Sequence, residues 1–291
     1  MNVLINKISK TIPATKSEIK INLKKYVNEI LVIKYGGSAM IDPKLSDNFS
    51  DNIKVLVDLG IKPIIVHGGG PQINEMLDSL NIKHKFFNGM RITDSKTFKI
   101  VEMVLSGSLN KNISFNLSRK GINAVGLSGI DAGLIVANKY SKKIKTDPDL
   151  GLVGKPKKIN KEFLLNLISK DIVPIIAPIG FSSQGVKLNI NADLTAGFIS
   201  SEINSRRLLM LTDVKGVIDK NKKLIPELKL KDINKLISNK VIYGGMIPKV
   251  KTCIEAVKKG VRASVILDGR VKNAILKELL SDKGIGTLFR K

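Results

Sequence analysis

Lys34 stands beside glycine-rich turns, a combination that suits the binding of phosphate groups. It opens the sequence KYGGS, which follows a short apolar run at residues 30–33. A second apolar run, 61–66, leads into the sequence HGGGP at 67–71. Glycines let a ligand approach the backbone closely, and the free N–H groups at the start of a helix favour an anion. No Walker A sequence occurs, so these turns do not form a P-loop.

Two other stretches carry side chains that could hold a small acid. Only seven of the 49 basic residues are arginine. The arginine at position 91, in a turn-rich segment, therefore suggests a need for the planar fork that binds a carboxylate. Asn189, Asn191 and Asp193 alternate, so they project to one side of an extended segment. Both features also have ordinary interpretations: Asp193 could cap the helix that follows it, and Arg91 could be a surface residue.

Alternating strands and helices would position these residues. Short apolar runs bounded by Gly or Pro predict strands, and amphipathic runs predict helices. The expected strands are 30–33, 61–66, 124–127, 172–177, 207–211 and 263–267, and the expected helices are 48–59, 73–80, 95–106, 109–120, 160–169, 194–203, 250–259 and 273–280. Segments 134–136 and 144–153 predict a hairpin arm. The alternation indicates an α/β protein, a three-layer αβα sandwich with a largely parallel sheet, whose glycine-rich turns meet at one sheet edge.

The chain divides into three parts. Residues 1–28 are polar and basic and precede the first strand, so they form either a frayed terminus or an arm that packs on another subunit. A turn at 182–185 separates an N-terminal lobe at 29–184 from a C-terminal lobe at 185–291.

Composition narrows the class of protein. The net charge of +24 could attract anionic substrates, but the lysines are spread along the chain and aromatic residues make up only 4%, which argues against nucleic-acid binding. No apolar run is long enough to cross a membrane. Cys253 is the only cysteine, so no intrachain disulfide is possible. We expect a cytoplasmic protein, or a plastid stromal one if the source is an alga.

Six motifs in order carry a family resemblance. The chain resembles the amino-acid kinase superfamily from about residue 30 onward, and within it the N-acetyl-L-glutamate kinases. The alternatives are a uridylate or carbamate kinase, or a non-catalytic amino-acid sensor on the same fold. The motifs are KYGG at 34–37, HGGGP at 67–71, GMRIT at 89–93, NINAD at 189–193, TDVKG at 212–216 and GMIPK at 245–249.

The resemblance implies ATP-dependent phosphorylation of the side-chain carboxylate of N-acetyl-L-glutamate, the second step of arginine biosynthesis. It implies that Lys34 and Lys249 neutralise the transferring phosphoryl group and that Asp193 orients both ammonium groups. The acetylglutamate residues would be Gly69, Gly70, Arg91 and Asn189. The phosphate and nucleotide residues would be Gly36, Gly37, Thr212, Asp213, Gly216, Gly245 and Met246. Mg²⁺ would be held mainly by the nucleotide phosphates, without an all-protein metal site.

The ends of the chain resemble the longer, arginine-inhibited kinases. An N-terminal arm with Tyr26 before the first strand, together with Glu278 and Gly284, would form the site for L-arginine. Such arms interlace dimers into a hexamer, so the resemblance implies a trimer of dimers. It also raises the PII signalling protein as a partner.

Overall fold

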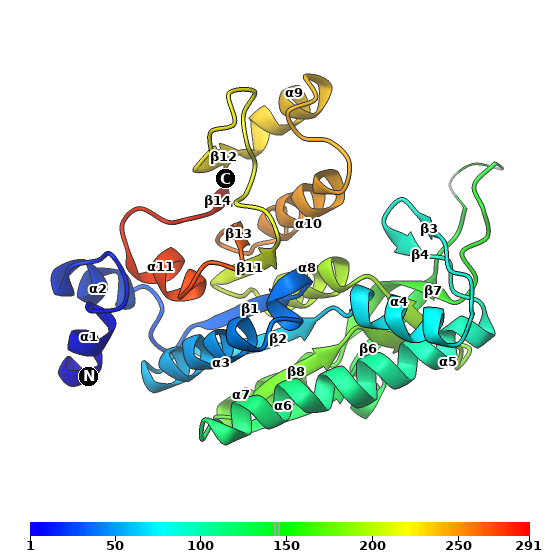
Figure 1. The fold of residues 1–291 in the computed structure, drawn as a ribbon, viewed down its shortest axis with the longest axis horizontal. Helices are drawn as coiled ribbons and strands as arrows, with labels where there is room; N and C mark the ends of the chain where they lie inside the picture. Colours follow the sequence, from blue (N-terminus) through cyan, green and yellow to red (C-terminus); the bar gives the residue numbers. More distant parts are fainter. Residues whose placement is uncertain (143, 145) are drawn as a thin grey trace.

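The computed structural model, which describes residues 1–142, 144 and 146–291, is built around an eight-stranded sheet (Figure 1). All neighbouring strands in it are parallel except the antiparallel pair β13 and β14. The strands, in spatial order, are β12 (Glu227–Lys229), β14 (Thr287–Arg290), β13 (Ser264–Asp268), β11 (Arg207–Thr212), β1 (Ile30–Tyr35), β2 (Lys62–His67), β8 (Val173–Ala177) and β5 (Ala124–Ser128).

Helices cover both faces of this sheet, because alternate residues of its central strands are buried on opposite sides. One apolar core joins the sheet to α1 (Asn2–Ile8), α2 (Lys16–Leu23), α3 (Pro43–Asp58), α6 (Asn110–Arg119) and α11 (Ala274–Leu280). The other joins it to α7 (Lys161–Ser169), α8 (Ala192–Glu202), α9 (Ile233–Ser238) and α10 (Met246–Lys258). The predicted αβα sandwich with a largely parallel sheet is confirmed.

A third core lies beside the carboxyl ends of β2 and β8. It is formed mainly by α4 (Gly70–Ser79), α5 (Ser95–Glu102) and the π-helix η2 (Met103–Leu109). The two helices predicted at 95–106 and 109–120 are one continuous run, in which η2 joins α5 to α6. Short 3-10 turns are η1 (Gly37–Met40), η3 (Asp131–Gly133) and η4 (Leu230–Asp232).

Two small β structures accompany the sheet. The hairpin of β3 (Phe86–Phe87) and β4 (Met90–Arg91) stands out from the molecule (Figure 1). A four-stranded closed barrel contains β6 (Ile135–Lys139), β7 (Val153–Ile159), β9 (Ile179–Phe181) and β10 (Lys187–Ile190). β10 begins after the predicted lobe boundary at residue 184 but pairs with β7 and β9, which precede it.

The predicted hairpin arm is wrong in its second half. β6 does pair antiparallel with a later strand, but that strand is β7, which starts at Val153 instead of ending there. Part of the predicted segment, residue 145, lies outside the described residues. The apolar residues of 144–153 favour a strand there, but the strand that pairs in the barrel is β7. Its three exposed positions are all lysines.

The N-terminal segment is folded onto its own chain, which excludes a frayed terminus. Ile19 and Leu23 of α2 are buried in the same core as α11, and Ile5 and Ile8 of α1 join them. The Asn22 amide donates to Asp282 at 2.8 Å, just beyond α11. Figure 1 shows α1 and α2 beside α11 at one end of the molecule.

No helix among the described residues is long and apolar enough to span a membrane.

Candidate active site

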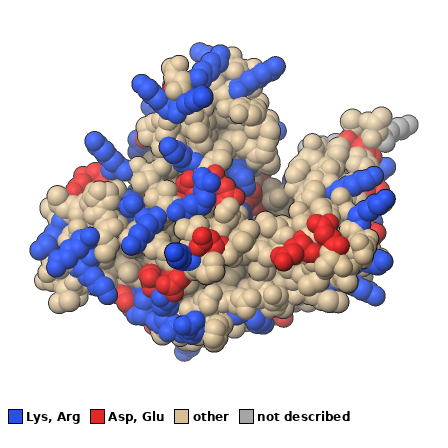
Figure 2. Space-filling model, in the orientation of Figure 1, with Lys and Arg blue, Asp and Glu red and all other residues tan. Residues whose placement is uncertain are grey.

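Two cavities adjoin where β1, β2 and β11 end, at the sheet edge that the glycine-rich turns predicted. Their volumes are about 240 and 910 Å³. Both are lined by Lys34, Gly37 and Lys249, so a ligand in one cavity would lie next to a ligand in the other. Figure 2 shows the surface hollowed between the β3–β4 hairpin and the part that carries α9 and α10.

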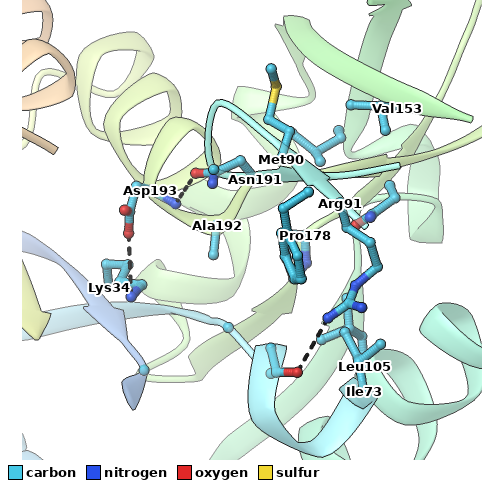
Figure 3. A pocket seen from close by; sticks show the side chains of 18 of the residues that line it. Lys34, Ile73, Met90, Arg91, Leu105, Val153, Pro178, Asn191, Ala192 and Asp193 are labelled. Carbon is cyan, nitrogen blue, oxygen red and sulfur yellow. Dashed lines mark hydrogen bonds and ion pairs between the residues drawn. The ribbon is translucent and has the colours of Figure 1, made fainter. Parts of the chain in front are cut away.

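One carboxylate holds two lysines at the junction of these cavities. Asp193 Oδ1 lies 3.2 Å from Lys34 Nζ, and Asp193 Oδ2 accepts a hydrogen bond from Lys249 Nζ at 2.7 Å. Figure 3 shows Lys34 and Asp193 facing each other at one end of the smaller cavity. The side chains of Lys34 and Asp193 are about nine-tenths buried, and that of Lys249 is a quarter exposed. The three side chains together carry a net charge of +1 beside the space where the cavities meet.

Asp193 is not the cap of its helix. The cap of α8 is Asn191, whose Oδ1 accepts from the N–H groups of Asp193 and Leu194 at 2.9 and 3.1 Å. Asp193 lies in the first turn, where its carboxylate is free to meet the lysines. The capping interpretation of Asp193 is therefore wrong, because the helix begins two residues earlier, with Asn191 as its cap.

The two lysines keep Asp193 ionised. Burial raises the pKa of its carboxyl, but the charges of Lys34 and Lys249 outweigh burial and lower the pKa to about 2. The Asp193 carboxylate is accordingly not a proton donor at neutral pH and can only act through its charge and its contacts.

Arg91 projects into the smaller cavity from β4 and is held there by two kinds of contact. Its Nη2 donates to Asn74 Oδ1 at 2.6 Å and to the Gly70 carbonyl at 3.3 Å, and its guanidinium lies over the Phe86 ring at 4.6 Å. Its other terminal nitrogen, Nη1, is buried and has no hydrogen-bond partner among the residues that the structure describes. Burial lowers the pKa of Arg91, opposed by the nearby charge of Asp78. An orphaned buried donor of this kind suits an incoming carboxylate.

The other residues predicted for acetylglutamate also line this smaller cavity: Gly69, Gly70 and Asn189. Asn189 donates to Thr93 at 3.1 Å, which fixes its amide. A Cβ on Gly69 would lie 2.4 Å from Leu109 and 2.7 Å from Leu105, so a larger residue there would have to push these two leucine side chains aside. Gly36 lines this cavity as well, beneath the side chain of Lys34.

The residues predicted for the nucleotide surround the larger cavity: Gly37, Thr212, Asp213, Gly216, Gly245 and Met246. Asp213 accepts from the Ser38 N–H at 2.8 Å and so links the end of β11 to the turn after β1. Gly37 has φ +72 and leaves no room for a side chain next to Asp213. The structure thus brings every predicted catalytic, substrate and nucleotide residue to one of two neighbouring cavities.

Sequence reasoning missed several residues of the smaller cavity. Phe86 and Met90 come from the β3–β4 hairpin, Pro178 follows β8, and Leu105 comes from the π-helix (Figure 3). Asn74, which holds Arg91, was missed as well. Asn74 lies on α4, one turn after the HGGGP motif, and this spacing was the signal available for it.

The residues predicted for L-arginine lie near one another at a different place. Glu278 Oε2 accepts from the N–H groups of Ile285 and Gly286 at 2.8 and 3.0 Å, and a Cβ on Gly284 would lie 2.7 Å from it. Burial raises the pKa of Glu278, which the two N–H donors and the charge of Arg207 oppose. Arg207, whose charge acts on Glu278, also donates to the Tyr26 hydroxyl from Nε at 3.2 Å and from Nη2 at 3.1 Å.

Comparison with known proteins shows the family of this chain. The model of the amino acid kinase family matches residues 29–268. This chain belongs to the amino acid kinase family. Among its relatives are the acetylglutamate kinase of Methylobacterium nodulans, 47% identical over 93% of this chain and 91% of the relative, and that of Parvibaculum lavamentivorans, 49% identical over 92% and 91%. The predicted resemblance to this family is confirmed.

Solved structures give the same fold. A Streptococcus mutans protein, smu.665, is 31% identical to this chain and has a TM-score of 0.76. The match covers 91% of this chain and 99% of smu.665. The N-acetylglutamate synthase of Neisseria gonorrhoeae has a TM-score of 0.84 at 19% identity, covering 94% of this chain, which spans only 62% of the synthase. Carbamate kinase from Giardia lamblia has a TM-score of 0.65 at 19% identity over 90% and 98%. The last two likenesses concern the fold alone.

Proposed function

We propose that this amino acid kinase transfers the γ-phosphoryl group of ATP to the side-chain carboxylate of N-acetyl-L-glutamate, a step of arginine biosynthesis. The observation that carries the proposal is the Lys34–Asp193–Lys249 arrangement at the junction of a small cavity lined by Arg91 and a large one lined by Thr212 and Asp213. The smaller cavity could hold other small acids, and the support for acetylglutamate is that the relatives are named acetylglutamate kinases.

The chemistry needs positioning and positive charge more than proton transfer. An oxygen of the substrate carboxylate, already ionised at neutral pH, attacks the γ-phosphorus, and the bond to the β–γ bridging oxygen breaks, so that ADP leaves with the electron pair. No proton has to be removed. Lys34 and Lys249 offset the repulsion between the two anions, and Asp193 keeps both ammonium groups at the junction. Arg91, with its unpartnered Nη1, holds the α-carboxylate at the far end of the cavity.

Mg²⁺ would come with the nucleotide. Among the described residues, no group of three His, Cys, Asp or Glu side chains is placed to hold a metal ion. The phosphates of ATP would therefore supply most of the ligands, and Asp213 and Asp219 are the carboxylates that line the larger cavity. A magnesium ion held in this way would supply charge neutralisation at the phosphates.

The deciding experiment is coupled ADP release with and without N-acetyl-L-glutamate. We expect turnover that depends on acetylglutamate and falls by about 10²-fold or more in Lys249→Ala, because a charge that stabilises the transition state is lost. The matched control is Lys251→Ala, an exposed lysine on the same helix, which should keep wild-type activity. Turnover with carbamate or uridylate instead would contradict the substrate, and unaltered activity in Lys249→Ala would contradict the mechanism.

We also propose that L-arginine binds at Glu278, Tyr26 and Gly284. Glu278 is a buried carboxylate near the charge of Arg207, and Gly284 packs directly against it. The expected result is inhibition by millimolar arginine that is lost in Glu278→Gln, measured with the same assay. Inhibition that survives Glu278→Gln would place the effector elsewhere.

The trimer of dimers and the PII partner remain predictions from the family resemblance. Light scattering of the purified chain tests the first, and co-elution with PII tests the second.

A further inference from the structure

The π-helix η2 ends at a buried asparagine that the proposed chemistry does not use. Asn110 is fully buried at the start of α6. Its Nδ2 lies 2.9 Å from the Ile175 carbonyl, 3.1 Å from the Leu127 carbonyl and 3.1 Å from His67 Nε2. One side chain therefore touches the ends of β2, β5 and β8. A π-helical turn inside an α-helix often marks a functional site.

These contacts determine how His67 carries its proton. Its Nδ1 lies 2.8 Å from the Gly68 carbonyl, which can only accept, so Nδ1 is the protonated nitrogen. Nε2 then carries no proton and accepts from Asn110 Nδ2, whose two N–H groups are shared among three acceptors: His67 Nε2 and the carbonyls of Leu127 and Ile175. The Asn110 amide cannot be turned round, because two carbonyls face its nitrogen. Burial lowers the pKa of His67 to about 4, opposed by the Gly68 hydrogen bond, so the ring stays neutral at physiological pH.

The π-helix η2 also packs against Gly69, two residues after His67 in the glycine-rich turn. Leu105 and Leu109 of η2 pack so closely on Gly69 that a Cβ there would lie within 2.7 Å of both. Asn110 fixes His67 and, through it, the Gly68 carbonyl. The π-turn thus holds Gly68 by hydrogen bonds and Gly69 by packing, while Gly68, Gly69 and Leu105 line the smaller cavity.

We propose that Asn110 is a positioning residue for the kinase reaction: through the neutral ring of His67 it sets the Gly68–Gly70 backbone against the substrate and the transferring phosphoryl group. Asn110 touches neither ligand cavity in this role. Its effect reaches the reaction only through His67 and Gly68. The proposal rests on the proposed function, because it assigns the turn to that chemistry.

The first test reads the hydrogen bonds without using activity. The chain has only two histidines, so ¹⁵N NMR of the labelled imidazoles resolves His67 from the partly exposed His84. We expect His67 with a proton on Nδ1, none on Nε2, and no titration above about pH 5. Loss of the Asn110 donor in Asn110→Ala should shift the Nε2 resonance. A His67 ring protonated on Nε2, or one that titrates near its usual pKa, would overturn the proposal.

The second test separates positioning from general loosening. We expect Asn110→Ala to lower kcat/KM for acetylglutamate about tenfold, the effect of one buried hydrogen bond, and to leave KM for ATP within twofold. His67→Gln should do the same, and the double variant should be no worse than either single one, because both break one chain of contacts. Asn112→Ala, an exposed asparagine on the same helix, is the matched control.

Circular dichroism and ATP binding show which variants are folded. If Asn110→Ala does not fold, His67→Gln carries the kinetic test alone. Folded variants with wild-type kinetics, equal rises of KM for both substrates, or strictly additive losses would each overturn the proposal. Absence of acetylglutamate kinase activity in the wild type would contradict the proposed function. The NMR result would still decide whether Asn110 hydrogen-bonds to His67.

Discussion

Individual side chains at this site act mainly through fixed charge. Lys34 and Lys249 come from opposite ends of the chain and meet at Asp193, whose ionised state they secure. Arginine is rare here, and at two positions its side chain makes paired contacts: Arg270 donates to both oxygens of Asp268, and Arg91 donates to Asn74 and Gly70. A lysine could supply the charge of Arg91 but not its geometry.

Replacing Arg91 by lysine should therefore raise KM for acetylglutamate about tenfold or more, through loss of bidentate binding to its carboxylate. KM for ATP should stay unchanged, because Arg91 lines only the smaller of the two cavities. Steady-state kinetics with each substrate varied in turn gives both constants. Arg119→Lys, at an exposed position, is the control. Equal changes in both KM values would contradict this assignment.

His67 makes stability depend on pH. Its pKa in the fold, about 4, lies below the usual 6.5, so the unfolded chain binds more protons between these values. The neutral ring's contribution is complete above pH 6.5 and is lost as pH falls toward 4. Between pH 7 and pH 5 it accounts for about 2 kcal/mol. Urea unfolding at both pH values should therefore show a smaller drop in the free energy of unfolding for His67→Gln than for wild type.

Helix starts at this site set where functional groups point. α8 begins at the Asn191 cap, which places Asp193 in the first turn beside the lysines. α7 begins in the same way with Asn160, whose side chain accepts from the Phe163 N–H at 3.2 Å, but it carries no residue of either ligand cavity. The two caps share their chemistry, and only the first turn of α8 carries a residue of the site.

This pair allows a matched test at the level of the helix. Asn191→Ala and Asn160→Ala should each lower the free energy of unfolding by about 1 kcal/mol, the usual cost of a lost cap. Only Asn191→Ala should also lower kcat, because the first turn of α8 then holds Asp193 less firmly. Chemical denaturation and steady-state assays measure the two effects. A loss of kcat in Asn160→Ala would show that general destabilisation, not the position of Asp193, limits the rate.

At the scale of the whole molecule, the charge is dispersed and the N-terminal segment is part of the core. Figure 2 shows lysine and arginine side chains over all parts of the visible face, which agrees with their spread along the sequence. α1 and α2 pack with α11, the helix that carries Glu278. Tyr26, which follows α2, contacts Arg207 at the start of β11. The N-terminal segment can therefore affect the residues proposed to bind L-arginine from within the same chain.

Two isoleucines of α2 test this packing. Ile19 is fully buried, and Ile19→Ala should lower the free energy of unfolding by about 2–4 kcal/mol. Ile21 is 57% exposed, and Ile21→Ala should change stability by no more than about 0.5 kcal/mol. Denaturation at several protein concentrations, together with the mass from light scattering, distinguishes packing within the chain from packing on another subunit. An unchanged stability in Ile19→Ala with an altered mass would show that the segment packs on another subunit.

The sequence by itself determined the fold class and the chemistry of the turns. Short apolar runs ending in glycine are local signals, and local backbone preference is enough to specify strand–turn–helix units. The six motifs in their order indicated the family. Tertiary structure alone decided that Asn191 and not Asp193 caps α8, that β6 pairs with β7, and that Asn110 reaches His67. The first depends on the residue at which α8 begins, and the other two depend on residues far apart in the chain. Spacing along the sequence specifies neither.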